Sequence, residues 1–337
     1  MGAHTVSVII PTKNPGSGFV SVLASVCEQK TGFPYEVLVV DSGSTDGTIE
    51  HVQQLGDHRV RLHRIAPHEF GHGRTRNLGI SLCDGTYAAF LTHDARPARD
   101  DWLATLVAIA EMDASVAGVF GRHLANPDAN PFTVRDLISH FEQFEHDPVH
   151  QLQDHAVYAR SVACRRRLRF FSDNNALVRR AAWERIPYPD VEFAEDQLWA
   201  QQVIEGGWKI AYAHNACVYH SHDYGFRERL RRSFDEAYAV HELFGDQLLR
   251  SAGHAFYFYA HRTLADFAYA RRQNLCRSNA VAVRKMPLDN LMRACGYYLG
   301  GRGKLLPRSV RNWLSLDRRL LLGLDNRMSG AADRGRI

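Results

Sequence analysis

Two adjacent carboxylates, Glu195 and Asp196, offer the clearest acid–base chemistry in this sequence. They open a predicted helix just after Phe193, where the positive end of the helix favours ionised acids. A carboxylate held at that position can act as a general base towards an alcohol. Helix-end charge alone also explains the pair, so a structural and a catalytic interpretation both stay open at this point.

Polar stretches also follow three apolar runs in the first hundred residues. The stretches are Pro11–Asn14, Asp41–Thr48 and Thr92–Asp94. Ligands of open α/β sheets bind at the carboxyl ends of the strands, where the following loops form a crevice. Each acid in isolation could be an ordinary residue of a strand-to-loop turn. Because the pattern occurs three times, we expect the three polar ends to share one pocket.

Candidate ligands for anions and metals come from arginine and histidine. Arg74 and Arg76 fall in the first turn of a predicted helix, where cations oppose the helix dipole. That placement favours a nearby anion such as a diphosphate, although a surface position explains it equally well. His220 and His222 lie on one side of an extended segment, which suits a metal or a phosphate. Two histidines alone are a weak metal site.

A cluster of small polar residues precedes the predicted helix that contains Trp183. Its members are Ser172, Asn174 and Asn175. Hydroxyl and amide groups of this kind bind the hydroxyls of sugars, and they also end turns. The residue types do not decide between the two roles.

Alternating apolar runs and helical patterns must position these residues. The predicted strands are 6–10, 35–40, 60–65, 87–91, 116–121 and 208–212, and the predicted helices include 17–27, 47–55, 74–83 and 102–111. This order predicts an α/β fold with a mainly parallel sheet flanked by helices.

The composition, 45% hydrophobic and 23% charged, is that of a soluble globular protein. No run of about 18 apolar residues occurs, so we expect no transmembrane helix. The N-terminus lacks a basic region followed by an apolar one, which argues against a secretory signal and favours a cytoplasmic location. The six cysteines are scattered without a C-x-x-C pair, and we expect them to be free thiols.

The net charge of +4 conceals an asymmetry between the two parts of the chain. Residues 1–224 carry 20 Lys and Arg against 27 Asp and Glu, whereas 225–337 carry 21 against 10. We therefore expect a helical, arginine-rich C-terminal extension, with basic residues interleaved with leucines such as Leu305 and Leu320–Leu322. It could touch an anionic membrane, or pack on the catalytic domain or a second subunit. The acidic first part argues against binding nucleic acid.

Five segments together resemble the inverting glycosyltransferases of family 2, which have a GT-A fold. They are Ile10–Asn14, Val40–Thr48, Arg76–Gly79, Leu91–Asp94 and Glu195–Asp196, and the resemblance spans about residues 5–224. Four further stretches look most like bacterial rhamnosyltransferases of cell-surface polysaccharide synthesis: His68–Gly73, Thr92–Ala95, Ala194–Gln197 and Tyr219–His222.

The resemblance implies a Rossmann-like GT-A catalytic domain over residues 1–224. Within it, 1–100 would be the nucleotide-binding half and 101–224 the acceptor half, followed by the helical C-terminal region 225–337. The residues expected at the nucleotide sugar are Pro11, Thr12, Asn14, Asp41, Arg76, Thr92, His93 and Asp94. By the same resemblance Asp41 would read the pyrimidine ring, and Arg76 would lie beside the nucleotide.

The resemblance further implies the catalytic groups. Asp196 would deprotonate the acceptor hydroxyl, with Glu195 beside it. Asp94 would carry Mg²⁺ or Mn²⁺, with His220 as a further ligand of the metal or the diphosphate. We expect the acceptor to be contacted by Asn174, Asn175 and Trp199.

One position departs from the family pattern. The metal motif is commonly D-x-D, and Thr92 stands where its first acid is expected. Only one acid of the motif, Asp94, is then left for the metal. Because Mg²⁺ is often held by one or two carboxylates plus phosphates, we expect Asp94 to need help from His220 or from the diphosphate.

The resulting prediction is an inverting hexosyltransferase that moves rhamnose from dTDP-rhamnose onto a surface glycan or lipid-linked acceptor. It would be cytoplasmic, with peripheral contact to the membrane and a homo-oligomer both open. Alternatives are a family 2 enzyme that uses a UDP-sugar, or a non-enzymatic membrane- or polyanion-binding protein. A nucleotidyltransferase is disfavoured because the first loop lacks a glycine-rich, basic triphosphate pattern.

Overall fold

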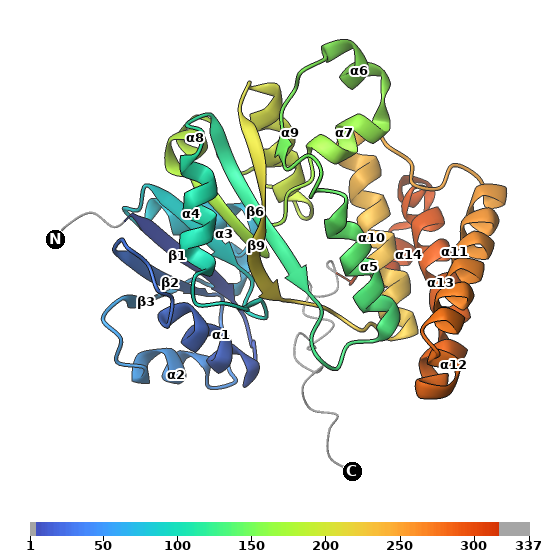
Figure 1. Ribbon diagram of the computed structural model, residues 1–337, viewed down its shortest axis with the longest axis horizontal. Helices are drawn as coiled ribbons and strands as arrows, with labels where there is room; N and C mark the ends of the chain where they lie inside the picture. The colour runs from blue at the N-terminus through green and yellow to red at the C-terminus, as the bar shows by residue number, and fades with distance from the viewer. Residues whose placement is uncertain (1–4, 317–337) are drawn as a thin grey trace. The chain divides into compact units, whose positions relative to one another are not determined.

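The computed structural model describes residues 5–316, and the predicted alternation of strands and helices is present in it (Figure 1). The strands are β1 (Val6–Thr12), β2 (Tyr35–Asp41), β3 (Val60–Arg64), β4 (Tyr87–Leu91), β5 (Arg96–Pro97), β6 (Val116–Leu124), β7 (Val149–His150), β8 (Asn175–Arg179) and β9 (Lys209–Tyr219). Five predicted strands match β1, β2, β3, β4 and β6 closely. In β1 and β2 the β-branched apolar runs suit buried parallel strands.

Helices fill the connections between these strands. They are α1 (Gly18–Cys27), α2 (Thr48–Gln54), α3 (His72–Ser81), α4 (Trp102–Glu111), α5 (Pro131–Glu142), α6 (His155–Arg160), α7 (Val162–Leu168), α8 (Arg180–Arg185) and α9 (Glu195–Glu205). After β9 the described chain is helical: α10 (Phe226–Phe244), α11 (Ala252–Arg272), α12 (Leu275–Ser278), α13 (Ala280–Gly300) and α14 (Arg308–Leu314). Two short 3₁₀ turns lie at Pro67–Glu69 and Gly303–Leu305.

Among the described residues, nine strands form one mixed sheet. The order is β3-β2-β1-β4-β8-β6-β9-β5, and β7 pairs with β9. The first four strands of this order run parallel, so Thr12 of β1 lies level with Asp41 of β2. Their carboxyl ends therefore meet at one edge, as the sequence pattern required.

The sequence did not predict β5, β7 or β8, and β8 is the longest of these three strands. β8 runs antiparallel to both neighbours, β4 and β6, and pairs Asn175 with Leu91. Because of this reversal, the chain entering β8 lies beside the chain leaving β4. Residues just before Asn175 therefore reach the same edge as Thr92–Asp94.

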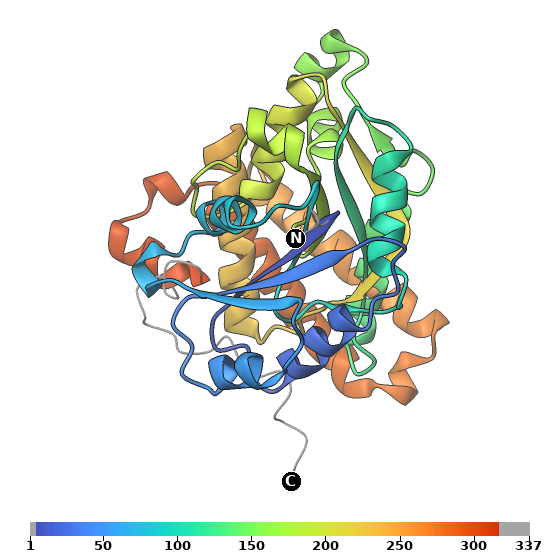
Figure 2. The same cartoon turned by 90° about the vertical axis from the view of Figure 1, so that its left-hand side faces the viewer.

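Apolar residues cover both faces of the sheet. One cluster packs α1, α2 and α4 on one face, with Leu23 and Trp102 fully buried. The other packs α3, α8 and α9 on the opposite face, with Phe90 and Trp199 fully buried. Figure 2 shows α1 and α2 on one side of the first strands and α3 on the other. The result is a helix–sheet–helix sandwich that holds the strand ends in place.

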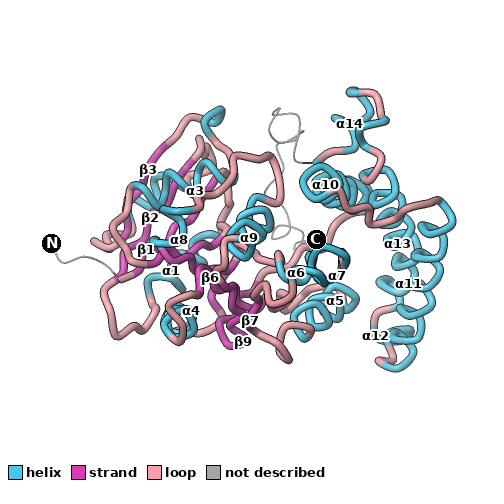
Figure 3. Tube along the Cα trace, turned by 90° about the horizontal axis from the view of Figure 1, so that it is seen from above, coloured by secondary structure: helices cyan, strands magenta, loops and turns pink. Residues whose placement is uncertain are grey.

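The chain divides into two compact units, and the second contains Ala129–Thr133 and the described residues 222–316. In its described part α13 packs along α10 and α11, and α11 and α13 lie side by side in Figures 1 and 3. A Cβ at Gly300 would lie 2.4 Å from the carbonyl oxygen of Phe234, so only glycine allows α13 this close to α10. Among the described helices none has the length and apolarity needed to cross a membrane.

The predicted helical character of the C-terminal region is confirmed for the described residues. The leucines Leu320–Leu322 lie outside the described residues. The predicted boundary at residue 224 stays a prediction.

Candidate active site

The loops after β1 and β2 are tied to each other by Asn14. Its backbone N–H donates to Ser44 Oγ at 2.8 Å, and its side-chain Oδ1 accepts from the N–H of Thr45 at 2.7 Å. Asn14 adopts a left-handed conformation with φ of +46°, which asparagine tolerates better than most residues. Pro11 and Thr12 end β1 directly before this turn. Two of the predicted polar ends are thus one connected structure.

Asp41 organises its own loop. Its carboxylate accepts from the N–H groups of Gly43 and Ser44 at 3.0 and 2.9 Å and from Thr12 Oγ1 at 3.2 Å. The residue has no exposed surface. These hydrogen bonds give the acid at the end of β2 a structural role, whether or not it also binds a ligand. The contact of Asp41 with a pyrimidine ring stays a prediction.

A histidine and an acid face each other beyond the end of β4. His220 Nδ1 lies 3.4 Å from Asp94 Oδ1, and the Asn174 amide lies 3.1 Å from His220 Nε2. Asp94 is exposed, whereas His220 is buried. The Asn174 amide can fix which ring nitrogen of His220 carries the proton. The pair predicted from the sequence to share a metal is therefore brought together, with Asn174 as its support.

Thr92 and His93 come directly before Asp94 in the chain. The Thr92 hydroxyl oxygen is buried and has no hydrogen-bond partner among the described residues. Burial lowers the pKa of His93, a shift that Asp94 opposes and His220 reinforces. The Thr92 hydroxyl oxygen could therefore act as a ligand at the position where the family pattern has a carboxylate.

A buried ion cluster joins α3, the start of α9 and the segment before β8. Arg76 Nε lies 2.9 Å from Asp173 Oδ2, and Arg76 Nη1 pairs with Glu195 Oε1. The three side chains are 6%, 1% and 7% exposed. The Tyr188 hydroxyl donates to Asp173 Oδ1 at 2.7 Å. The Arg76 guanidinium is therefore paired with two buried acids. Its predicted position beside the nucleotide stays a prediction. The exposed Arg74 pairs with Asp190.

Asp196 borders the ion cluster. It follows Ala194, whose φ of +57° is unusual for alanine, and its Oδ2 lies 3.4 Å from the N–H of Asp173. Desolvation raises the pKa of Asp196 well above its usual range, and the negative charges of Glu195 and Asp173 raise it further. Burial likewise raises the pKa of Asp173 to about 6 against the opposing charge of Arg76. A half-buried carboxylate with a raised pKa is a stronger base than an ordinary aspartate.

Two of the residues predicted to contact the acceptor are fully buried in this structure. Trp199 is fully buried, stacks on Tyr188 and donates its indole N–H to the carbonyl oxygen of Ile186 at 2.8 Å. Asn175 is fully buried as well, accepts from the Trp102 indole at 2.8 Å and donates to the carbonyl oxygen of Ala216 at 2.8 Å. Both side chains pack and hydrogen-bond within the core, and their contact with an acceptor stays a prediction. Asn174 contacts His220 instead of pointing into open solvent.

Asp173 is the site residue that the sequence reasoning missed. It stands inside the polar cluster Ser172–Asn175, in which the residue types point to its neighbours as ligands of sugar hydroxyls. The signal available was a charge placed between Phe171 and the apolar run 176–178, because an acid in such surroundings is seldom left unpaired.

Comparison with known proteins decides the family. Residues 7–186 match the family model described as Glycosyl transferase family 2. The chain belongs to that family. This glycosyltransferase is 30% identical over 316 residues to the O-antigen chain rhamnosyltransferase RfbN of Salmonella typhimurium, covering 92% of this chain and 94% of the relative. It is 26% identical over 315 residues to the O-antigen chain rhamnosyltransferase WbaN of Salmonella anatum, covering 92% and 93%.

A solved structure supports the fold of this glycosyltransferase. The mannosyltransferase PcManGT from Pyrobaculum calidifontis, solved in complex with GDP-Man and Mn²⁺, superposes with a TM-score of 0.61. The sequences are 19% identical, and the match covers 91% of this chain and 89% of that one. The predictions of a glycosyltransferase and of a GT-A-like α/β fold with a helical C-terminal region are therefore confirmed.

Proposed function

We propose that this family 2 glycosyltransferase moves rhamnose from dTDP-rhamnose onto a hydroxyl of a growing surface glycan or of a lipid-linked saccharide. The observation that carries this proposal is the similarity to two O-antigen rhamnosyltransferases over 92% of the chain. That similarity reaches beyond the family domain at 7–186 into the C-terminal region. It favours the rhamnosyl donor over a UDP-sugar.

Asp196 is the general base of this proposal. The acceptor oxygen attacks the anomeric carbon and gives its proton to Asp196, while the bond from that carbon to the diphosphate oxygen breaks. One displacement of this kind inverts the anomeric configuration. The raised pKa of Asp196 and its partial exposure support the assignment. Glu195, which Arg76 holds, positions the start of α9 and shapes the charge around the base.

Asp94 and His220 are the residues that would hold Mg²⁺ or Mn²⁺ in this proposal. A carboxylate oxygen and a ring nitrogen 3.4 Å apart suit one divalent cation, and His222 follows two residues along the chain as a further ligand. The bound ion would neutralise charge on the departing diphosphate. Asn174 can turn its amide oxygen towards His220 Nε2, which leaves Nδ1 free to coordinate.

A donor panel tests the sugar. We expect dTDP-rhamnose with Mn²⁺ to stabilise the protein against heat more than UDP-glucose, UDP-galactose or GDP-mannose do. At a donor concentration of about 100 Kd the gain is about 2.7 kcal/mol. Asp94→Ala and His220→Ala should lose the part of this thermal stabilisation that depends on Mn²⁺. The exposed control Asp128→Ala should keep it. A larger response to a UDP-sugar would overturn the rhamnosyl assignment.

The pH dependence of transfer tests the electrostatics around Asp196. The base must be deprotonated, so kcat/KM should fall as the pH drops through the raised pKa of Asp196. Asp173→Asn removes a repelling negative charge, which lowers that pKa. We expect the acidic limb of kcat/KM to move to lower pH by about one unit. The control Glu111→Gln, an exposed acid of α4, should leave the limb in place. An unshifted limb in Asp173→Asn would contradict the coupling.

A cytoplasmic location with peripheral contact to the membrane completes the proposal. A lipid-linked acceptor lies at a membrane surface, so an enzyme that rests there meets it at a raised local concentration. The basic C-terminal region supports such a contact through its charge. Homo-oligomer formation is the competing use of the same region.

A further inference from the structure

Several large apolar side chains of α11 and α13 are exposed. Phe256, Tyr257 and Leu264 of α11 are 70%, 64% and 69% exposed, and Phe267 is 38% exposed. Val281 and Leu288 of α13 are 60% and 41% exposed. We call these six residues the apolar face. Large apolar side chains gathered in this way mark a surface that meets a partner or a membrane.

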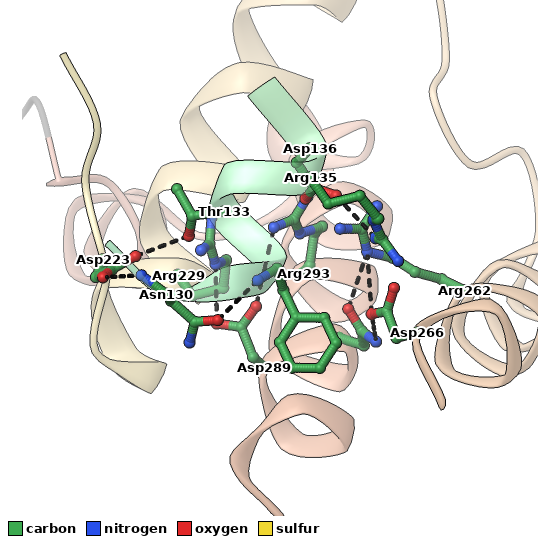
Figure 4. Close-up of polar contacts among 12 residues, drawn as sticks. Asn130, Thr133, Arg135, Asp136, Asp223, Arg229, Arg262, Asp266, Asp289 and Arg293 are labelled. Atoms are coloured by element: carbon green, nitrogen blue, oxygen red, sulfur yellow. Dashed lines mark hydrogen bonds and ion pairs between the residues drawn. The ribbon is translucent and has the colours of Figure 1, made fainter. Parts of the chain in front are cut away.

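The acids of this segment are paired within the helical unit. Between Ala252 and Leu291 the chain contains two acids, Asp266 and Asp289. Asp266 is 1% exposed and accepts from the Asn290 amide at 2.7 Å, while Arg262 donates to the other end of that amide at 2.9 Å. Arg262 also lies 4.0 Å from Asp266, and Figure 4 shows these two side chains together.

Asp289 is held in the same way. The Arg229 Nε donates to its Oδ1 at 2.9 Å, and Arg293 lies 3.9 Å from its Oδ2. Figure 4 shows these two arginines converging on Asp289. The acidic groups of α11 and α13 are therefore neutralised within the unit and contribute little negative charge to its surface.

Basic groups of the same segment point outward. The exposed cations are Arg271, Arg272, Arg277, Arg284 and Lys285. They flank the apolar face on α11, α12 and α13. Since the exposed part of Ala252–Leu291 carries cations and no acid, the charge of this surface is of one sign.

We propose that the apolar face and its flanking cations dock this enzyme on an anionic lipid bilayer. The aromatic and aliphatic side chains enter the boundary between head groups and acyl chains, and the arginines and lysine contact lipid phosphates. A second copy of the chain fits this surface poorly. In a two-fold contact the cations of both copies would face each other without an exposed acid to pair with.

This docking surface would give the enzyme access to a lipid-linked acceptor at the membrane. That purpose rests on the proposed function. The binding chemistry of the surface is independent of donor and acceptor. Vesicle binding without donor therefore tests the surface alone, and donor-dependent thermal stabilisation tests the transferase assignment alone. Either can fail while the other holds.

Co-sedimentation with vesicles is the test. We expect the full chain to pellet with vesicles of equal parts phosphatidylcholine and phosphatidylglycerol, and much less with phosphatidylcholine alone or at high salt. Phe256→Ser combined with Leu264→Ser should lower the partition coefficient by about tenfold. Arg271→Gln combined with Lys285→Gln should lower it by about fivefold for each charge removed.

Matched controls come from α6 in the first unit. Val157 is 50% exposed and Arg160 is exposed. Val157→Ser therefore removes an exposed apolar side chain, and Arg160→Gln removes an exposed positive charge, both outside the apolar face. Both should bind vesicles like the wild type. The proposal is overturned if the wild type does not bind anionic vesicles, or if the controls lose as much as the face variants. A dimer in sedimentation equilibrium that Phe256→Ser with Leu264→Ser dissociates would also overturn it, because the face would then be a subunit interface.

Discussion

Asp196→Asn is expected to lower kcat/KM for transfer by about 10²- to 10⁴-fold and to leave donor affinity close to that of the wild type. The amide has the size of the carboxylate but cannot take a proton from the acceptor. Removing a negative charge beside Glu195 and Asp173 relieves repulsion, so the variant should fold at least as well as the wild type. Single-turnover transfer measured beside donor titration separates the chemical step from binding.

An exposed acid on the same part of the chain serves as the control. Asp190→Asn removes a carboxylate that is 60% exposed and pairs with Arg74 at the surface. It should transfer at the wild-type rate. Wild-type turnover by Asp196→Asn would show that another group accepts the proton.

Arg76→Met is expected to reduce the free energy of unfolding by about 3–5 kcal/mol. The substitution leaves Asp173 and Glu195 buried without their cation, and the desolvation cost of these acids is then uncompensated. Urea denaturation, compared at equal m-value, measures the loss. The matched control Arg74→Met lies on the same helix but removes a surface pair, and it should cost at most about 1 kcal/mol.

Rescue separates loss of the ion cluster from loss of packing. Adding Asp173→Asn and Glu195→Gln to Arg76→Met neutralises the whole cluster, and a neutral cluster of similar volume is tolerated far better than a broken one. We expect the triple variant to regain most of the lost stability. If Arg76→Met proves no more harmful than Arg74→Met, the cluster does not stabilise the fold.

Sequence periodicity was sufficient for the parallel half of the sheet. Runs such as Val6–Ile10 and Tyr35–Val40 are apolar, β-branched and bounded by turn residues, so local pattern and tertiary role agree. β8 was missed because it begins with Asn175 and follows three polar residues. Its strand pairing depends on β4 and β6, which are far away in the sequence.

Residue types alone located part of the site but not the direction of its side chains. Arg74 and Arg76 were treated alike, although two helical residues point about 200° apart at 3.6 residues per turn. One therefore faces solvent and the other the buried acids. Trp199 similarly belongs to the buried side of α9, whereas Asp196 lies on its accessible side. Such differences come from tertiary packing, which a lone motif does not contain.

Because β8 runs in the reverse direction, the loops proposed to bind the donor and the segment that leads to the proposed base come from separate parts of the chain. Between β6 and β8 the chain leaves the sheet after Leu124, adds only the two-residue strand β7 beside β9, and returns at Asn175 next to the end of β4. Loops after β1, β2 and β4 precede this excursion completely. Changes of length or sequence within residues 125–170 can therefore alter what approaches the base while the strands beneath Asp41 and Asp94 stay the same. We expect enzymes of this architecture to diversify their acceptors faster than their donors.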